Sequence, residues 1–415
     1  MTAPLKESTL ANFMDRLRIK QRRIPLQGTV ETTFRCNLAC VHCYVNKPAG
    51  DADEKARELP LARLKELIDE AVASGCLEVL FTGGEILIRP DFEELYLYAV
   101  SKGLLVILFT NGTMVTDKVA DLLANHKPLR VEITLYGMTP ETYDKVTQVP
   151  GSFAKCMAGI DRLMQRGIAM KLKTIALTWN MHEIDSMRAF AASKGLEFKF
   201  DGFLNPRVDC GSNRNAELQV SPEQLLALDL ADPARMEEFK KFCEKAIPAP
   251  EAQEVREQVY TCGAGQTSFT VDPYGNMQLC QLSRKASYNL KGGTFDQAWN
   301  EFFPMLRARK WQSNSVCRKC NLLSLCASCP GAAEMEHGDV ESLVQNFCEA
   351  THLRAHALMA EKSGHRRDAS CCLGTGTLAR KVDAGTAAVP KSGCASCSSA
   401  KPAPTLVQLK FPSAK

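Results

Sequence analysis

The sequence lacks the features that mark three common classes of protein. Its formal net charge is only +4 over 415 residues, and no block of basic residues stands out, which argues against nucleic acid as a partner. The first 25 residues contain no apolar signal-peptide core, because charged residues such as Lys6, Asp15 and Arg18 interrupt them. The longest apolar run near a predicted strand, residues 104–109, is far too short to cross a bilayer. These absences predict a cytoplasmic protein with no membrane or nucleic-acid partner.

Cysteine is the residue that the sequence has in excess, with 18 copies. In a reducing compartment, clustered cysteines bind metal more often than they form disulfides. Cys36, Cys40 and Cys43 lie at C-x3-C-x2-C spacing on one short loop, which suits an iron–sulfur cluster. A structural zinc loop is the alternative, but zinc usually takes four protein ligands in paired C-x2-C spacings. A cubane cluster has four irons, so three cysteines leave one iron open for chemistry.

From residue 28 the sequence alternates between strand-like and helical segments. The predicted strands are residues 27–34, 77–82, 104–109, 129–135, 169–177 and 197–201. The predicted helices between them are residues 59–74, 91–101, 116–125, 152–166 and 182–194. Six strand–helix units in a row predict an α/β fold with a parallel sheet, and six rather than eight predict an open, partial (β/α)6 TIM-type barrel. In such folds ligands bind at the carboxyl ends of the strands, where the three cysteines fall.

Glycine and polar residues mark four further strands at the same edge of the predicted sheet, the last of which carries Lys171, Lys173 and Thr174. A glycine pair at a strand end allows a ligand to approach the backbone closely. Each of these short motifs is ordinary in a loop, but their joint occurrence at one rim predicts a ligand site. The residues at the other three strand ends are Gly83, Gly84, Glu85, Thr110, Asn111 and Thr134.

The three-cysteine loop followed by Gly83-Gly84-Glu85 resembles the radical SAM superfamily over about residues 25–205. The resemblance implies a [4Fe–4S] cluster on the three cysteines, with S-adenosylmethionine chelating the open iron. Gly83, Gly84 and Glu85 would meet the methionine amino group, and Tyr44 is the aromatic residue that often follows the third cysteine.

The same resemblance implies that Thr110, Asn111 and Thr134 contact the ribose or the carboxylate of S-adenosylmethionine. Many relatives have an aspartate where this chain has Tyr136, so no carboxylate role carries over to that position.

A second group of cysteines begins at Cys262. Four of its members lie within thirteen residues, a strong sign of metal ligands, for which a zinc ribbon is the alternative. A hairpin is predicted between the first two members, with strands at residues 267–271 and 277–279. The members are Cys262, Cys280, Cys317, Cys320, Cys326, Cys329 and Cys348.

This second group resembles the SPASM extension of radical SAM enzymes. The resemblance implies one auxiliary [4Fe–4S] cluster on Cys317, Cys320, Cys326 and Cys348, and another on Cys262, Cys280 and Cys329. The latter cluster is a ligand short. Cys243 or Cys210 supplies the missing ligand, or an iron stays open for a substrate thiolate.

Five regions follow from these patterns. They are an N-terminal helix and linker (residues 1–27), the barrel (28–205), a bridging region (206–260), the extension (261–362) and a tail (363–415). The bridging region is predicted to contain helices at residues 222–230, 234–245 and 251–260. The tail is low in hydrophobic residues and is predicted to be disordered, with metal handling by Cys371, Cys372, Cys394 and Cys397 as the alternative.

The family resemblance implies an enzyme that cleaves S-adenosylmethionine to a 5′-deoxyadenosyl radical. SPASM enzymes usually modify peptides or proteins, so the leading hypothesis is maturation of a ribosomally made peptide by a thioether or carbon–carbon cross-link. Tetrapyrrole side-chain modification and formylglycine formation in sulfatases are alternatives; relatives of the latter kind carry an aspartate where this chain has Gln281. A non-catalytic iron–sulfur electron carrier is a third. The implied partners are a peptide or protein substrate and a low-potential electron donor of the flavodoxin or ferredoxin type.

Overall fold

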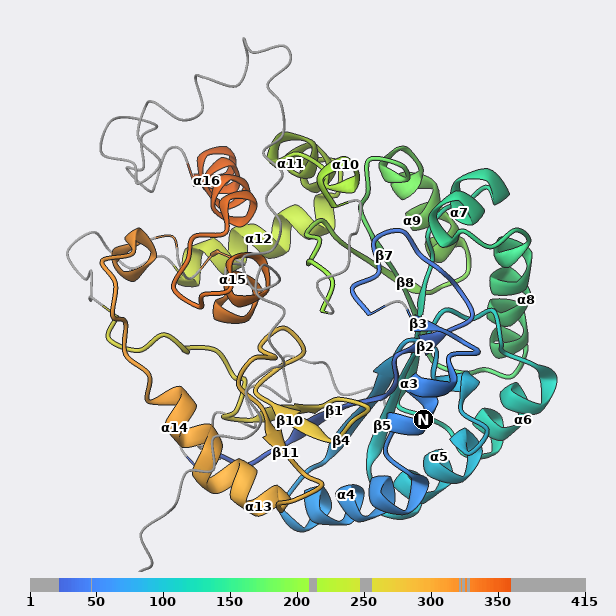
Figure 1. Ribbon diagram of the computed structural model, residues 1–415. Coiled ribbons are helices and arrows are strands. Elements are labelled where there is room, and N and C mark those ends of the chain that lie inside the picture. The colour runs from blue at the N-terminus through green and yellow to red at the C-terminus, as the bar shows by residue number, and fades with distance from the viewer. Residues whose placement is uncertain are drawn as a thin grey trace, which may run out of the picture.

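The computed structural model of the chain describes residues 22–45, 47–208, 215–246, 256–320, 322, 325–326 and 329–359. Within these residues, a nine-stranded sheet forms the centre of the molecule, in the order β11-β10-β9-β1-β4-β5-β6-β7-β8 (Figure 1). The strands are β1 (Gln27–Thr33), β4 (Glu78–Gly83), β5 (Leu105–Thr110), β6 (Arg130–Thr134), β7 (Met170–Ile175), β8 (Glu197–Asp201), β9 (Ser268–Val271), β10 (Asn276–Gln278) and β11 (Tyr288–Asn289). A separate pair joins β2 (Arg35–Cys36) to β3 (Lys47–Pro48).

Strands β1 and β4 to β8 are all parallel, which confirms the predicted α/β barrel architecture. Its helices are α3 (Ala52–Arg57), α4 (Leu61–Ala73), α5 (Phe92–Ser101), α6 (Asp117–Asn125), α7 (Pro140–Thr147), α8 (Ser152–Gln165) and α9 (Ile184–Ser193), with 3-10 turns η1 (Ile86–Ile88) and η2 (Met181–Glu183). Helices α4, α5, α6, α8 and α9 follow the outer side of the sheet in that order, whereas α3 lies beside the β2–β3 pair (Figure 1). The predicted strands and helices of the barrel end within about two residues of these bounds, but α3 and α7 were missed.

The remaining helices lie beyond the sixth strand of the barrel. They are α10 (Asn215–Leu218), α11 (Pro222–Leu230), α12 (Pro233–Ala246), α13 (Phe295–Gln297), η4 (Ala298–Phe302), α14 (Phe303–Arg307), η5 (Val316–Lys319), α15 (Pro330–His337) and α16 (Gln345–Met359). Helix α16 packs beside α11 and α12 (Figure 1), where the buried carboxylate of Asp229 accepts from Arg235 and Arg354, each at 2.7 Å. No helix among the described residues is long and apolar enough to span a bilayer.

The helix predicted for residues 251–260 is wrong over its described part, residues 256–260. The chain there is extended: Gln258 forms a bridge with Lys310, and the Val259 amide donates to the Arg309 carbonyl at 3.0 Å. Pairing with a distant segment takes the place of the local hydrogen bonds that a helix would make.

The two faces of the barrel sheet differ in polarity. Alternate residues such as Phe81, Leu108 and Ile133 are wholly buried and belong to the main core with the helices. Because side chains alternate along a strand, the positions between them face the barrel interior, and these include Glu31 and Glu132. The interior is therefore lined by charged groups, as expected of a site and not of a second core.

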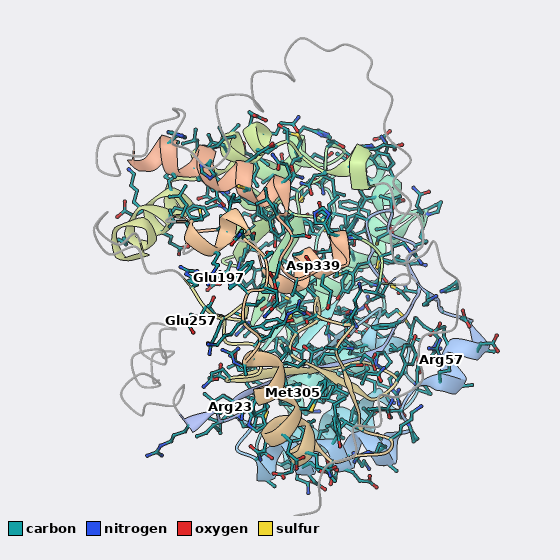
Figure 2. All side chains as sticks on the ribbon, turned by 60° about the vertical axis from the view of Figure 1, so that its left-hand side comes forward. Arg23, Arg57, Glu197, Glu257, Met305 and Asp339 are labelled. Carbon is teal, nitrogen blue, oxygen red and sulfur yellow. The ribbon has the colours of Figure 1, made fainter. Side chains whose placement is uncertain are left out.

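The extension continues the barrel sheet. Strand β9 pairs in parallel with β1, with Gln27 opposite Ser268 and Val30 opposite Val271, and β10 then pairs antiparallel with β9. The predicted hairpin is thus confirmed. Its attachment is reinforced where the chain enters β1, because the Arg23 guanidinium donates to the carbonyls of Gly265 and Trp299. Figure 2 shows Arg23 on the same side of the molecule as α14.

The glycine pair at the end of β4 lies directly against the segment that leads into the cysteine loop. The Gly84 amide donates to the Thr33 carbonyl at 2.6 Å, and the Glu85 amide donates to the Arg35 carbonyl at 2.9 Å. A Cβ atom on Gly83, whose φ is +129°, would lie 2.1 Å from the Thr33 carbonyl oxygen, and one on Gly84 would lie 2.2 Å from that of Arg35. The close approach of the end of β4 to residues 33–35 therefore requires both glycines, whether or not a ligand is bound.

We expect Gly84→Ala to lower the free energy of unfolding by about 2–3 kcal/mol, because the atom that the new methyl meets is backbone and cannot rotate away. Gly292→Ala is the matched control, since a methyl there meets nothing within 4 Å and should change stability by less than about 0.5 kcal/mol. Denaturant unfolding of the two variants measures the difference. Equal stability would show that the close approach is not rigid.

Candidate active site

The cysteine loop is fixed by backbone hydrogen bonds to the end of α7. The Ala39 amide donates to the Thr147 carbonyl and the Val41 amide donates to the Val146 carbonyl, both at 3.0 Å. On the other side the Arg35 guanidinium forms a two-pronged ion pair with Glu58, at 2.8 and 3.1 Å. Such a pair is geometrically specific, so the residue before Cys36 has a defined position.

The three thiols of the loop lie close enough to interact. The pKa of Cys36 is raised to about 12, chiefly by burial and also by the nearby Glu85 and Cys43. Burial also raises the pKa of Cys40 well above its ordinary value, with Cys43 and then Cys36 adding to the effect. A positively charged metal centre would reverse this preference and stabilise the thiolates, which are the ligand form.

No three His, Cys, Asp or Glu side chains in the described ranges lie close enough to share one metal ion. The cysteines of an iron–sulfur cluster bind different irons, so a cluster requires only that the thiols face a common volume. Both cysteine groups carry free thiols, and the mutual effects on their pKa values show that the members face one another. The donor set fits an iron–sulfur cluster.

Glu85 is wholly buried beside this loop. Its carboxylate accepts hydrogen bonds from the Thr110 hydroxyl and the Asn111 amide, both at 2.8 Å, and from the Leu87 amide at 3.1 Å. Burial raises the pKa of Glu85, and these hydrogen bonds act in the opposite direction. The structure therefore brings together three of the residues predicted at the rim.

Asn111 connects this group to the cysteine loop. Its side-chain amide nitrogen lies 3.7 Å from the Cys36 sulfur and 2.9 Å from the Asn37 oxygen, and its oxygen accepts from the Thr113 amide at 2.9 Å. Asn111 thus orients the first cysteine in this structure. Thr134, also predicted as a cofactor contact, ends β6 opposite Lys173 of β7.

Sequence reasoning noted Lys173 on the fifth strand but missed the charged group that it forms with Glu132 and Arg130 on the inner wall of the barrel. Glu132 accepts from the Arg130 guanidinium at 2.8 Å and lies 3.4 Å from the Lys173 ammonium. Burial lowers the pKa of Lys173 to about 7, Glu132 opposes the shift, and Arg130 and Lys199 add to it. The sequence does contain a pattern that could have predicted this group, because charged residues occupy every second position in two of the predicted strands.

The second cysteine group forms two sets. Burial raises the pKa of Cys280 to about 11, and the nearby Cys329 and Cys262 also raise it. Burial likewise raises the pKa of Cys317, with Cys326 and then Cys320 as its charged neighbours.

Cys329 also has Cys326 as a charged neighbour, so the two sets adjoin, and their division between two clusters stays a prediction. The buried Cys348 follows Phe347, whose carbonyl lies 3.9 Å from the Cys326 sulfur. Cys210, the side chain of Cys243 and the tail cysteines lie outside the described residues. Their predicted roles stay predictions.

The low pKa of Lys173 has a consequence for stability. Between about pH 7 and pH 10 the unfolded chain holds this proton and the folded chain does not, so the free energy of unfolding rises with pH. Lys173→Met removes the cost of burying this amine, and with it the pH dependence that Lys173 adds to the free energy of unfolding. We expect it to be more stable than the parent by about 1–3 kcal/mol at pH 7, with the gap closing toward pH 10.

The matched control for Lys173→Met is Lys155→Met, which removes an exposed lysine from α8 that does not act on Lys173. It should show no such pH dependence. Thermal unfolding of the three proteins across this pH range makes the comparison, and a pH-independent gap for Lys173→Met would contradict the assignment.

Comparisons with known proteins identify the family of this chain. The Radical SAM superfamily model matches residues 30–191. Mycofactocin maturase MftC of Mycobacterium ulcerans (strain Agy99) is 30% identical over 310 residues, 73% of this chain and 82% of that protein. The antilisterial bacteriocin subtilosin biosynthesis protein AlbA of Bacillus subtilis (strain 168) is 27% identical over 322 residues, 74% and 67% of the two chains.

A crystal structure of Streptococcus suis SuiB bound to precursor peptide SuiA has a TM-score of 0.61 at 15% identity and covers 84% of this chain and 83% of that one. This last similarity shows the fold. With the family model, the relative at 30% identity and a three-cysteine loop at the carboxyl ends of a parallel sheet, the chain belongs to the radical SAM superfamily, whose members use a [4Fe–4S] cluster and S-adenosylmethionine.

Proposed function

We propose that this enzyme modifies a ribosomally made peptide by radical chemistry, forming a thioether or carbon–carbon cross-link. The observation that carries the proposal is the pair of cysteine groups on one continuous sheet: a three-thiol loop at the barrel rim and a second set beside the hairpin that extends β1. The two curated relatives have names that describe peptide maturation and bacteriocin biosynthesis, which supports a peptide substrate.

Cys36, Cys40 and Cys43 would hold the [4Fe–4S] cluster. When bound and reduced, the cluster and S-adenosylmethionine supply a 5′-deoxyadenosyl radical that removes a hydrogen atom from the substrate. The chain's own residues orient this chemistry. Asn111 and the Gly83–Gly84 backbone hold the loop, and the carbonyl groups of that glycine pair are suitable acceptors for the methionine amino group. An electron donor of the flavodoxin or ferredoxin type would reduce the centre.

The second cysteine group would hold two auxiliary [4Fe–4S] clusters. Cys317, Cys320, Cys326 and Cys348 supply four ligands to one of them, whereas Cys262, Cys280 and Cys329 supply three to the other. The proximity of Cys280 to Cys329 and Cys262 supports the second set. If neither Cys210 nor Cys243 supplies a fourth ligand, one iron is available to a substrate thiolate, and this would favour the thioether over the carbon–carbon product.

Replacing Cys36, Cys40 and Cys43 together by alanine should abolish formation of 5′-deoxyadenosine from S-adenosylmethionine under anaerobic, reducing conditions. Chromatography of the reaction mixture measures the product. Cys76→Ala is the control, because Cys76 is a buried cysteine outside both groups, and it should retain most of the activity. Product formation by the triple variant at the parent rate would refute the assignment of the loop.

Fully reconstituted protein should contain about twelve irons, and the triple variant about eight, if all three clusters are of the [4Fe–4S] type. Iron and acid-labile sulfide analysis gives both numbers. Cys317→Ala with Cys320→Ala should remove about four irons from the parent value. A parent value near four, accompanied by zinc, would mean that the extension is a zinc module and not an auxiliary-cluster module.

A further inference from the structure

A buried ion pair joins the strand that leads to the cysteine loop to the segment that follows Cys280. Glu31 of β1 is wholly buried, and its Oε1 accepts from the Arg284 Nη2 at 2.8 Å. Glu31 stands five positions before Cys36 in the sequence, and Arg284 stands four positions after Cys280. The pair therefore joins the barrel to the loop of the extension that carries Cys280.

The other contacts of the Glu31 carboxylate are long. The Tyr44 hydroxyl and the Gln281 side-chain nitrogen each lie 3.4 Å from the same Oε1, near the upper limit for a hydrogen bond. Asp272 is a second carboxylate that acts on both members of the pair. One guanidinium thus faces two carboxylates, so this group carries an excess of negative charge.

Both members of the pair keep a buried polar atom that is not used. Glu31 Oε2 and Arg284 Nε have no hydrogen-bond partner in the part of the chain that the structure describes. A buried polar atom without a partner costs about 1–3 kcal/mol, and in folded proteins such atoms are rare enough to require a reason. The pair offers one acceptor, on Glu31, and one donor, on Arg284.

We propose that Glu31 and Arg284 bind an amide group of the polypeptide substrate, with Glu31 Oε2 accepting its N–H and Arg284 Nε donating to its carbonyl. An amide satisfies both unused atoms. A carboxylate would be repelled by Glu31 and Asp272, and an ammonium group would leave the Arg284 donor unpaired.

Access to the pair passes Tyr44, Gln281 and Arg284, whose side chains are all partly exposed. Because the contacts of Tyr44 and Gln281 with Glu31 are long, moving those two side chains costs little. Tyr44, which contacts Glu31, directly follows Cys43 in the chain, and this connects the pair to the cysteine loop. This inference rests on the proposed peptide substrate and names the residues that would position it.

The test uses the reconstituted full-length enzyme with S-adenosylmethionine and a 12-residue peptide selected on it from a random library. Fluorescence anisotropy measures binding while each backbone amide of the peptide is replaced in turn by an ester. In the parent enzyme we expect one ester position to weaken binding about 5- to 10-fold. In Glu31→Gln the amide and ester peptides should bind equally. If the amide that binds the pair belongs to an Asn or Gln side chain of the peptide, its replacement by Asp or Glu should weaken binding to the parent enzyme and leave binding to Glu31→Gln unchanged.

Glu132→Gln is the matched control, because Glu132 is another buried carboxylate of the inner wall that is paired with an arginine; it should keep the ester effect. Arg284→Lys retains the charge and removes the Nε donor, and it supplies the measurement should Glu31→Gln not fold. Two results overturn the inference and leave the proposed peptide substrate standing. One is an ester effect that persists in both Glu31→Gln and Arg284→Lys, and the other is no ester effect in the parent enzyme. Failure of every peptide to bind, with 5′-deoxyadenosine still formed, overturns the proposed peptide substrate as well.

Discussion

The close approach of two backbones at Gly83 and Gly84 is the constraint on which the site depends. Hydrogen bonds from Gly84 and Glu85 to the carbonyls of Thr33 and Arg35 hold the exit of β1 against the end of β4. The cysteine loop starts at the next residue, so its position follows from this contact. A side chain at either glycine would separate the two segments. The glycine motif therefore serves the protein's own backbone first, and its proximity to a cofactor is a consequence.

The polarity of the two sheet faces decides where chemistry is possible. The outer face carries apolar residues that pack on the helices, whereas the inner face carries Glu31 and the pair of Glu132 with Lys173. Charges inside a protein are costly unless they are paired, and here they are paired across neighbouring strands or with the extension. The inner face therefore carries paired charged groups. Such groups can orient polar groups of a substrate, which a wholly apolar face could not do.

The extension is joined to the barrel by main-chain pairing as well as by side chains. Parallel pairing of β9 with β1 makes the hairpin an edge of the barrel sheet, and the Glu31–Arg284 pair then fixes the following loop over the interior. Because both contacts involve β1, the strand that leads to Cys36 also sets the position of Cys280. The relation between the two cysteine groups is a property of one strand and not of a flexible linker.

The sequence by itself determined the local features. Cysteine spacing indicated the cluster loop, alternating periodicity predicted the barrel strands and helices, and turn residues predicted the hairpin. Two helices of the barrel were missed for local reasons. Helix α3 is short and mostly charged, held by its Asp51 cap, and α7 is an eight-residue helix behind a Thr139 cap and a proline. Neither has enough turns for an apolar period to emerge.

Only the tertiary structure decided which distant residues meet. Glu31 and Arg284 are 253 positions apart, and residues 256–260 became extended because a remote segment paired with them. Periodicity tells which face of an element is buried, but it carries no information on what covers that face. The cysteines that would hold the clusters could therefore be named from the sequence, whereas the buried pair of Glu31 and Arg284 could not.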